Sequence, residues 1–511
     1  MESYITFVVK GTFAVFLGRL ISTLIAYLLR IYLARELSLA DYGVLYASIS
    51  FLTSIFTFRD LGLSTALARF VPEAVKQGKP ELARAYLKCA LLVHFLLTAL
   101  ICLPLILFAD PIATFLFHNP TASNVLRILA LGTLLSFYSL AFTAFLRGRK
   151  RILPYATFNV VYVLATLISL NFLFSFAKNA VVASVGFALG SVIAGAYVAF
   201  FAIKALPSSG RAKHELRQVL RSMLSFGLMA FLISLFLTLL GNFDTLLLAM
   251  LRSASEAGYY QVAVPTARLI LFFASSLTAV LLPVLSELWA KRNVQLLSKA
   301  MHLLLKFVCL AAIPLALWLF LFAEPIILIF FGQNYAEASI ALKFLSLAYF
   351  FYTLAQINLT CSMALNELKR TARFVGLALM ANLLLNSALI PSLGILGASF
   401  TALITFVLLF LLTTIDLKLT FLGLKGKLEL PSKAILLSFL AAVATAILVK
   451  VLQVVIALAL LPKLFILSSI ALIVYSLLLL LSGAVGGEDV KVLNKMVAKR
   501  RENSDGRLEI P

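Results

Sequence analysis

Three arginines lie inside long apolar stretches of this sequence, where a charge is costly. Arg19 and Arg30 occupy the first stretch and are eleven positions apart, about three helical turns, so they share one face of a helix. Arg268 lies in a later stretch. Placing a cation at mid-membrane costs about 2.5–3.5 kcal/mol, so such residues normally face a bundle interior or an aqueous cavity. Because a guanidinium fork binds two phosphate oxygens at once, the three arginines are candidate anion-binding residues.

The sequence leaves a simpler interpretation open for the first two arginines. Arg19 lies toward the start of its stretch, where an amphipathic helix end lets the side chain reach the cytoplasm. Arg30 lies toward the other end, from which a long side chain can extend to the outer membrane boundary. In that case both residues mark the limits of a span and bind no ligand.

A polar stripe runs along the second apolar stretch. Its members are separated by three or four residues, which keeps them on one narrow helical face: Tyr46, Ser50, Thr53, Thr57, Asp60 and Ser64. A helix that faces only lipid has no such stripe, so this face points into protein or water. We predict that Tyr46, Ser50 and Thr53 contact a substrate and that Asp60 holds a coupling ion.

Arg59 precedes Asp60 and projects from nearly the opposite side of a regular helix, while Gly62 is a point where that helix can bend. The sequence does not decide whether Arg59 and Asp60 pair. It also leaves open whether both charges simply mark the cytoplasmic end of the span.

Asp244 is the second carboxylate within an apolar stretch, and Asn242 and Thr245 lie beside it. We predict that Asp244 and Asn242 take part in binding the coupling ion, either Na⁺ or H⁺. Tyr155 and Asn159 begin a further one-face stripe and are predicted to contact the substrate. Interhelical hydrogen bonding is the alternative role for these amides and hydroxyls. Similar polar residues in the stretches are Tyr162, Thr166, Asn382 and Asn386.

The apolar stretches that carry these residues set the fold class. The chain has 511 residues, of which 62% are hydrophobic and 13% charged, and its mean hydropathy is +1.06. This composition predicts an all-α integral membrane protein. A spanning helix needs about 20 mostly apolar residues, and about fourteen such stretches are present. They are centred near Leu24, Ser50, Thr98, Leu135, Leu164, Val192, Leu237, Phe272, Ala312, Phe351, Leu384, Ile404, Ala442 and Val474.

The net charge of +22 has a distribution that argues against a nucleic-acid partner. Lysines and arginines gather in alternate loops, such as 147–151, 204–221 and 418–433. Because basic loops of membrane proteins usually face the cytoplasm, this pattern predicts that both termini are cytoplasmic. These loops also predict contact with anionic lipids. The four cysteines and four histidines have no metal or redox spacing, so we expect no metal site and no cofactor.

Two halves of the chain resemble each other at an offset of about 215 residues. The segment ARELSLADYGVLY at 34–46 aligns with AMLRSASEAGYYQ at 249–261, and DPIATFLF at 110–117 aligns with EPIILIFF at 324–331. Six spans separate the copies, so they form a parallel repeat, as in transporters with a central site. Under this offset Asp244 aligns with the position before Arg30. We therefore hypothesise that Asp244 and Arg30 form an ion pair. The predicted parts are a six-helix bundle at 1–205, a basic linker at 206–221, a second bundle at 222–420, two further helices at 421–485 and a cytoplasmic tail at 486–511.

Several segments resemble the polysaccharide-export (Wzx-like) flippases. They are GRLISTLIAYLLRIYLARELSLADYGVLYA, DLGLSTALARFVPE, NFDTLLLAMLRSASEAGYYQVAVP and LLLNSALIPSLGILGASFTALIT. This family belongs to the MOP superfamily, with the multidrug extruders (MATE) and the lipid II flippase MurJ. The resemblance implies two six-helix bundles that form a V around a central cavity and alternate between inward-open and outward-open states. It also implies a monomer in the cell membrane that works beside glycan-assembly enzymes.

A flippase of this kind moves a polyprenyl-(pyro)phosphate-linked oligosaccharide outward, which needs guanidinium groups for the phosphate and hydroxyls and aromatic rings for the sugars. Arg19, Arg30 and Arg268, with the polar stripes, match that need. A cation-coupled MATE-type antiporter is the alternative, but it favours a cavity dominated by carboxylates. An enzyme is disfavoured because the chain has no D-x-D motif and no long extracytoplasmic loop.

Overall fold

The computed structural model describes residues 2–206, 216–272, 285, 288–289, 292–365, 367–423, 431–455 and 459–484. These residues form eighteen α-helices and two short 3-10 helices, with no strand among them. Twelve helices of this part are long and apolar enough to cross a membrane, and the bent pair α6–α7 makes a thirteenth candidate. The predicted class, an all-α multi-pass membrane protein, is confirmed.

Contacts divide the chain into two compact units. The larger unit comprises residues 14–265 and 368–402, and the smaller unit comprises residues 1–13, 266–367 and 403–511. The predicted linker at 206–221 lies largely outside the described residues, and the tail at 486–511 lies wholly outside them. The predicted boundaries of the two bundles stay a prediction.

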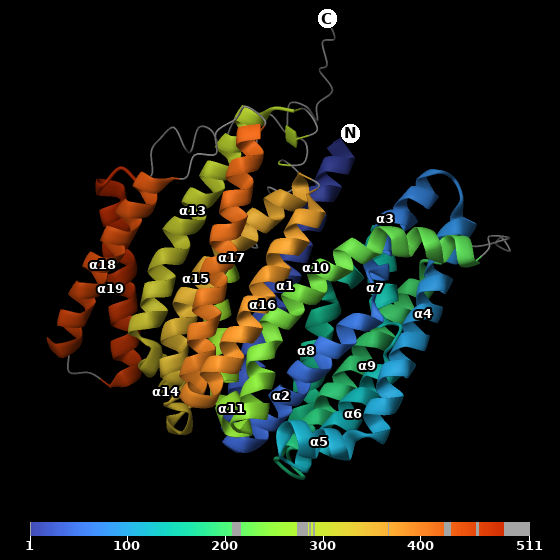
Figure 1. The fold of residues 1–511 in the computed structure, drawn as a ribbon, viewed down its shortest axis with the longest axis horizontal. Coiled ribbons are helices and arrows are strands. Elements are labelled where there is room, and N and C mark those ends of the chain that lie inside the picture. The colour runs from blue at the N-terminus through green and yellow to red at the C-terminus, as the bar shows by residue number, and fades with distance from the viewer. Residues whose placement is uncertain are drawn as a thin grey trace, which may run out of the picture. The chain divides into compact units, whose positions relative to one another are not determined.

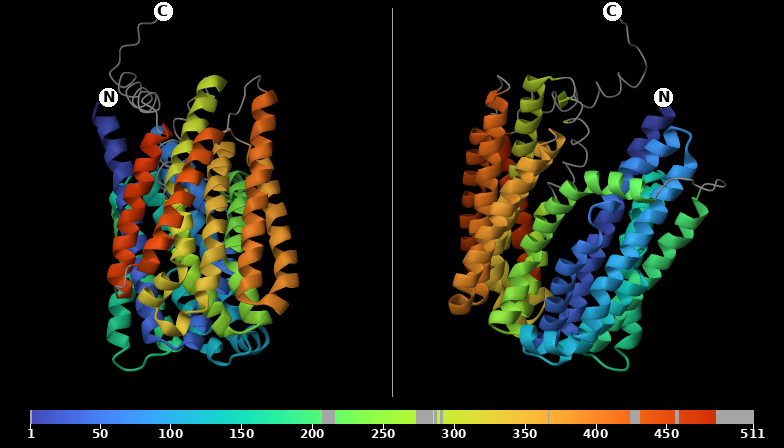
Figure 2. Two further views of the ribbon diagram at one scale, coloured as in Figure 1. Left: turned by 90° about the vertical axis from the view of Figure 1, so that its left-hand side faces the viewer. Right: turned by 45° about the vertical axis from the view of Figure 1, so that its right-hand side comes forward.

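The larger unit contains most of the polar residues singled out above, and Figure 1 labels the helices of the chain. Its elements are α1 (Glu2–Glu36, from position 14), α2 (Leu39–Phe56), η1 (Thr57–Arg59), α3 (Leu63–Lys76), α4 (Pro80–Leu107), α5 (Ala109–Phe117), α6 (Thr121–Leu135), α7 (Ser139–Gly148), α8 (Ile152–Leu173), α9 (Ala180–Lys204), α10 (Leu216–Leu251), α11 (Ala254–Arg268), α16 (Leu368–Leu393) and the start of α17 (Ile395–Gly423). The long helix α10 is curved (Figure 2), and it packs along α2, α3 and α16. Buried side chains of α3, α4, α7 and α9, such as Leu67, Phe145 and Val198, form a hydrophobic core.

The smaller unit is built around α13 (Val294–Leu321), which packs against α15 and α18. Its other described elements are α14 (Ala323–Phe330), η2 (Gln333–Tyr335), α15 (Ala338–Ala364), the rest of α17, α18 (Ser432–Val455) and α19 (Leu460–Leu481). The last two helices pack against each other, and α14 contacts α19. The final pair of predicted spans therefore covers one side of α13.

The helices follow the apolar stretches closely, with two qualifications. The stretch near Leu135 is divided into α6 and α7, which meet at an angle of 40°. The stretch near Phe272 continues into residues outside the described part, so the predicted total of about fourteen spans stays a prediction.

The internal repeat has a structural counterpart at the start of two helices. The Asp41 carboxylate accepts a hydrogen bond from the backbone N–H of Ala180, the first residue of α9. The Glu256 carboxylate accepts one from the N–H of Ile395, the first residue of α17. Positions 41 and 256, and positions 180 and 395, both differ by 215. Each copy thus uses its acid to satisfy a free N–H at a helix N-terminus, where negative charge is also favoured.

A second correspondence lies where α4 and α13, each of 28 residues, end. The helical conformation is interrupted at Phe108 (φ −101°, ψ 23°) before α5 and at Phe322 (φ −100°, ψ 18°) before α14. Beyond the first break, the Ser123 hydroxyl and the Arg127 guanidinium hold the pKa of the exposed Asp110 carboxyl below its usual range. The repeated D/E-P-I motif thus starts a short helix after the same backbone break in both copies.

The two repeat glycines touch within the larger unit. A Cβ built at Gly43 of α2 would lie 1.8 Å from the carbonyl oxygen of Ala254 and 3.2 Å from the nitrogen of Gly258 in α11. A Cβ at Gly258 would lie 3.0 Å from the carbonyl oxygen of Leu39. Only glycine allows this approach, because any side chain would overlap backbone that cannot rotate away. The glycines of the repeat therefore set the contact between its two copies.

We expect Gly43→Leu to destabilise the protein by about 1–3 kcal/mol or more, as overpacking of a close contact usually does. The matched control is Gly423→Ala, where a Cβ meets nothing within 4 Å. Thermal unfolding in detergent, followed by size-exclusion chromatography, measures both. An unchanged melting temperature for Gly43→Leu would show that α2 and α11 do not need this contact.

Candidate functional site

Arg30 is held in place by two groups within the larger unit. Its Nη1 donates to the Gln261 side-chain oxygen at 3.0 Å and to the Gln261 backbone oxygen at 3.2 Å. Its guanidinium carbon lies 4.2 Å from the centre of the Tyr46 ring, within the range of a cation–π contact. These are its polar contacts among the described residues, so the other guanidinium N–H groups keep their capacity to bind a ligand.

Gln261 connects four helices. Its amide nitrogen donates to the Thr245 hydroxyl at 2.8 Å and to the Ser50 hydroxyl at 3.1 Å, while its oxygen accepts from Arg30. The side chain is 5% exposed, so nearly every polar atom it has is used inside the protein. The bonds join α1, α2, α10 and α11 through one residue.

The network follows the repeat. Positions 30 and 245 differ by 215, as do positions 46 and 261. Each copy therefore contributes the same two positions, Arg30 with Tyr46 in one and Thr245 with Gln261 in the other. The four side chains meet at the contact between the copies, and only the first pair carries a charge.

Asp244 lies in a closed cage of donors. Its carboxylate accepts from the Tyr260 hydroxyl at 2.7 Å and from the amides of Asn386 and Asn382 at 2.6 and 3.1 Å. The residue is 6% exposed, and the Asn386 side-chain oxygen is buried without a hydrogen-bond partner. The predicted partner Asn242 instead donates to the Thr238 carbonyl of its own helix.

The stripe around Asp60 is not one continuous helix, which corrects the regular geometry assumed for it. The helix α2 ends at Phe56, η1 follows, and Leu61 and Gly62 take left-handed conformations with φ of 45° and 77°. Gly62 sits against Gly227 of α10, where a Cβ would lie 2.1 Å from the Gly227 carbonyl oxygen. The glycine thus breaks the helix and permits this approach, so the stripe divides into two parts.

Four residues of the stripe, Thr53, Thr57, Asp60 and Ser64, line a cavity of about 360 Å³ within the larger unit. Hydroxyl groups, two phenylalanines and two opposite charges surround it. The lining residues are Thr53, Phe56, Thr57, Arg59, Asp60, Gly62, Ser64, Thr65, Leu140, Ala230, Phe231, Ser234 and Thr238. Arg59 and Asp60 both line this cavity, at the point where α2 has given way to η1.

The two charged side chains, Asp60 and Arg59, differ in their hydrogen bonding. One oxygen of Asp60 accepts from the Ser64 hydroxyl at 2.6 Å and the Ser64 N–H at 3.0 Å, and it lies 3.1 Å from Nε2 of His94. The Arg59 guanidinium lies 5.6 Å from the Phe56 ring, and its Nη1 is buried with no hydrogen-bond partner. No salt bridge between these two neighbours is found among the described residues.

The remaining predicted residues lie outside the Gln261 network, and of these Thr53 lines the cavity beside Asp60. Arg19, Thr53 and Asn159 are exposed, and Tyr155 is half-buried with the Arg147 guanidinium 5.8 Å from its ring. Arg268 lies in the smaller unit, where its Nε donates to the Tyr349 hydroxyl at 2.7 Å. Of the predicted residues, Arg30 and Tyr46 thus contact each other directly, and Ser50 is joined to Arg30 through Gln261.

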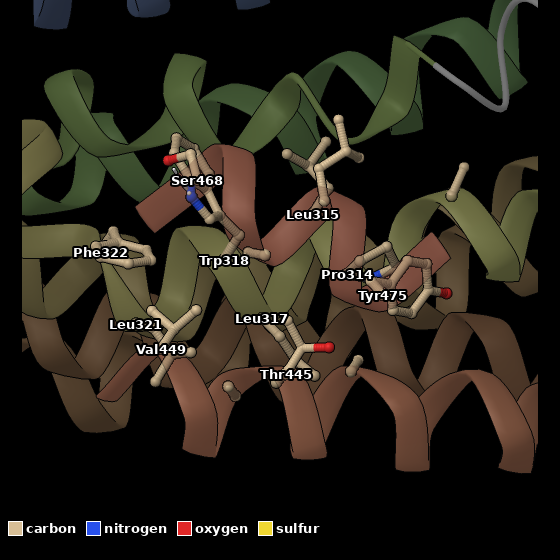
Figure 3. Close-up of a pocket in the computed structure, with 15 residues that line it drawn as sticks. Pro314, Leu315, Leu317, Trp318, Leu321, Phe322, Thr445, Val449, Ser468 and Tyr475 are labelled. Atoms are coloured by element: carbon tan, nitrogen blue, oxygen red, sulfur yellow. Dashed lines mark hydrogen bonds between the residues drawn. The ribbon is translucent and has the colours of Figure 1, made fainter. Parts of the chain in front are cut away.

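An apolar cavity of about 340 Å³, which the sequence analysis did not predict, lies between α13, α18 and α19 of the smaller unit. Trp318, Pro314 and Leu321 of α13 face Thr445 and Val449 of α18 across it (Figure 3). The Trp318 indole N–H donates to the Ser468 hydroxyl of α19 at 2.9 Å. The indole N–H and the Ser468 hydroxyl thereby satisfy each other, and most of the side chains that line the cavity are apolar.

Three residues that the structure places at these sites were not among the predicted site residues. Gln261 and Tyr260 lie within the repeated segment 249–261, so the repeat was the signal that pointed to them. His94 gave no signal, because it is a single histidine in an apolar stretch and its partner is 34 positions away.

Two family models match the chain. One, described as polysaccharide biosynthesis protein, covers residues 8–289, and another, described as MatE, covers residues 229–391. An uncharacterized membrane protein of Methanocaldococcus jannaschii, MJ1068, is 28% identical over 418 residues, which are 78% of this chain and 82% of that protein. The probable low-salt glycan biosynthesis flippase Agl15 of Haloferax volcanii is 22% identical over 375 residues, which are 73% and 76% of the two chains.

Among solved structures, the fold is similar to that of the lipid II flippase MurJ in an inward closed conformation. The TM-score is 0.72 at 17% identity, and the match covers 92% of this chain and 98% of that one. The first family model spans more than half of the chain, and the fold agrees with it. The protein is thus a member of the polysaccharide biosynthesis protein family, within the MOP superfamily of membrane flippases and transporters.

Proposed function

We propose that the protein moves a polyprenyl-(pyro)phosphate-linked oligosaccharide from the cytoplasmic to the outer face of the cell membrane by alternating access. The observation that carries this proposal is the state of Arg30. Tyr46 and Gln261 fix its guanidinium group, while its remaining N–H groups have no partner among the described residues. A guanidinium that is fixed and only partly used is suited to hold a phosphate through two hydrogen bonds.

The cavity beside Arg59 and Asp60 has the chemistry of a sugar site. Six hydroxyl-bearing residues line it, together with Phe56 and Phe231. Sugars bind through hydrogen bonds to such groups and through contact of their apolar faces with aromatic rings. The unpartnered Arg59 Nη1 adds a donor for a phosphate or a sugar oxygen.

The apolar cavity of the smaller unit supports a lipid-linked substrate. Its lining by α13, α18 and α19 is almost entirely hydrocarbon and aromatic (Figure 3), which suits part of a polyprenyl chain. The relatives point the same way, since one is described as a glycan biosynthesis flippase and a similar fold is that of a lipid II flippase.

We infer that Asp244 holds the coupling ion, Na⁺ or H⁺. The carboxylate is buried with Asn382 and Asn386, whose amides have an oxygen and a nitrogen end. Turning both amides would present their oxygens beside the carboxylate, and oxygen ligands of this kind suit a hard cation. A proton on Asp244 would be accommodated by the same turn, because the acid then donates to an amide oxygen.

The charge distribution supports one orientation of the protein in the membrane. We propose that both termini and the basic loops lie in the cytoplasm, where they contact anionic lipids. We further propose that the protein acts as a monomer, with glycan-assembly enzymes as its protein partners.

A cation-coupled multidrug antiporter of the MATE type is the second candidate. The match of the MatE model to residues 229–391, which include the Asp244 cage, favours it. Its substrate cation needs carboxylates in the cavity, whereas Arg30 and Arg59 repel a cation. The two functions therefore differ in which side chains transport needs.

We expect Arg30→Ala to abolish transport of a fluorescent polyprenyl-diphosphate oligosaccharide in proteoliposomes, and Arg30→Lys to restore only part of it. An ammonium binds phosphate as a point charge and does not provide the two-pronged contact. Loss of a charge-assisted hydrogen bond costs about 1.5–3 kcal/mol, or roughly ten- to a hundred-fold in affinity. Arg151→Ala, at an exposed arginine of a basic loop, is the matched control and should transport normally.

The same proteoliposomes, loaded with a cationic dye, separate the two candidate functions. Efflux of the dye that needs Asp244 and is indifferent to Arg30 would favour the antiporter. Transport of the glycolipid by Arg30→Ala at the wild-type rate would contradict the phosphate role of this residue.

We expect Asp244→Asn to uncouple transport from an imposed Na⁺ or H⁺ gradient while the protein stays in the membrane. The amide keeps the size of the carboxylate but removes the charge that binds a cation. Asp110→Asn is the control, because that carboxylate is exposed and pairs with Arg127 outside the cage. Initial rates with and without each gradient measure the effect, and an unchanged gradient dependence would exclude Asp244 from coupling.

A further inference from the structure

His94 is a buried ionisable side chain that the proposed transport steps do not use. It lies in the middle of α4 with 0% exposure, in a helix that otherwise carries mostly apolar residues there. Its Nε2 is 3.1 Å from a carboxylate oxygen of Asp60. Burying an imidazole in hydrocarbon is costly unless both ring nitrogens are partnered, so the position calls for an explanation.

The Asp60 carboxylate connects this histidine to the cavity. One oxygen, Oδ1, takes all three hydrogen bonds, two from Ser64 and one from His94. The other oxygen, Oδ2, has no partner among the described residues and is not fully buried. Asp60 lines the cavity, so the carboxylate has one oxygen toward the protein and one that is available to what enters the cavity.

Three polar atoms around this pair are buried without a partner. They are Nδ1 of His94, the hydroxyl of Thr98 one turn along α4, and Nη1 of Arg59. Buried polar groups are nearly always hydrogen-bonded, so a cluster of exceptions indicates that something is bound there in part of the working cycle. The atom that can change its own requirement is Nδ1, which accepts in the neutral ring and donates in the protonated one.

We propose that His94 and Asp60 form a proton-binding site, and that its occupancy is linked to the binding of an anionic phosphate group at Arg59. This proposal rests on the function proposed above. In the empty state the neutral imidazole donates to the Asp60 carboxylate, whose charge is balanced by the neighbouring guanidinium. A proton taken up on Nδ1 gives an imidazolium beside the carboxylate, and the local charge rises by one.

The charge balance sets the direction of the linkage. An added positive charge in a low-dielectric interior is unfavourable by itself, and a phosphate at Arg59 offsets it. The phosphate therefore favours proton uptake. By thermodynamic reciprocity, the protonated pair binds phosphate more tightly than the unprotonated pair.

The surroundings of His94 keep this exchange local. Among the described residues, Asp60 is the ionisable group that contacts its ring. Cys102 lies two turns along α4 and is buried. The other charged groups on α4 and on the helices packed against it are Glu81, Arg84 and Lys88 on α4, Arg69, Glu73 and Lys76 on α3, Asp110 on α5, Arg127 on α6, Arg147 on α7, and Arg217 and Arg221 on α10, with Asp41 on α2 and Asp244 on α10.

Isothermal titration calorimetry of the purified full-length protein tests the linkage. The probe is geranylgeranyl diphosphate, a short prenyl diphosphate, titrated in two buffers of different ionisation enthalpy so that the heat reports the protons taken up. We expect the wild type to take up close to one proton per diphosphate at a pH where His94 starts neutral. Binding should weaken by up to about tenfold per pH unit above that point, since one proton is linked to one anion.

The decisive variant is His94→Gln. The glutamine amide can still donate to Asp60 but does not titrate, so we expect binding with no proton uptake and little dependence on pH. His118→Gln, at an exposed histidine outside the site, should keep the wild-type uptake. If His94→Gln does not fold, Asp60→Asn tests the same point, because it removes the counter-charge of the imidazolium and should reduce the uptake.

The outcomes separate this inference from the proposed function. Equal proton uptake by the wild type and His94→Gln, or binding by the wild type without uptake, overturns the linkage and leaves the flippase intact. A wild-type protein that binds no diphosphate at any pH overturns both. Uptake that is present in the wild type and in His118→Gln and absent in His94→Gln supports the assignment.

Discussion

A polar side chain inside a membrane helix must find its hydrogen-bond partners within the protein, and the interior of the larger unit is organised by this constraint. Gln261 satisfies it for four helices at once, since it accepts from Arg30 and donates to Thr245 and Ser50. Removing this side chain would take one acceptor from Arg30 and the shared donor from the Ser50 and Thr245 hydroxyls, in a medium that offers no replacement. The contact between the two repeat copies therefore depends on one amide as well as on the close approach of Gly43 and Gly258.

The same constraint distinguishes structural polar groups from functional ones. The Asp244 carboxylate is enclosed by three donors, which suits an ion site that is closed in this state. Arg30, Arg59 and His94 are each held by the protein while part of their hydrogen-bonding capacity is unused. Incomplete partnering at a cavity is costly in an empty protein. It becomes favourable when a phosphate, a sugar or a proton supplies what is missing.

The repeat supplies a symmetric frame with asymmetric chemistry. Asp41 and Glu256 perform the same task at the starts of α9 and α17, so both copies keep the same helix arrangement there. At the contact between the copies, however, one contributes a cation and an aromatic ring where the other contributes a hydroxyl and an amide. Such a difference matches the proposed substrate, because a symmetric site would offer its phosphate two equivalent places.

The sequence alone determined the membrane class, the approximate spans and the repeat, because these depend on hydropathy and spacing along the chain. It also singled out Arg30 on one helix and Tyr46 with Ser50 on the next, since helical periodicity fixes which residues of a helix share a face. The tertiary structure alone decided which faces meet. His94 contacts Asp60 across 34 positions, and Arg59 lines the same cavity as Asp60 although a regular helix would point them to nearly opposite sides. Periodicity describes one helix at a time, whereas the partner of a buried polar group is chosen by how separate helices pack.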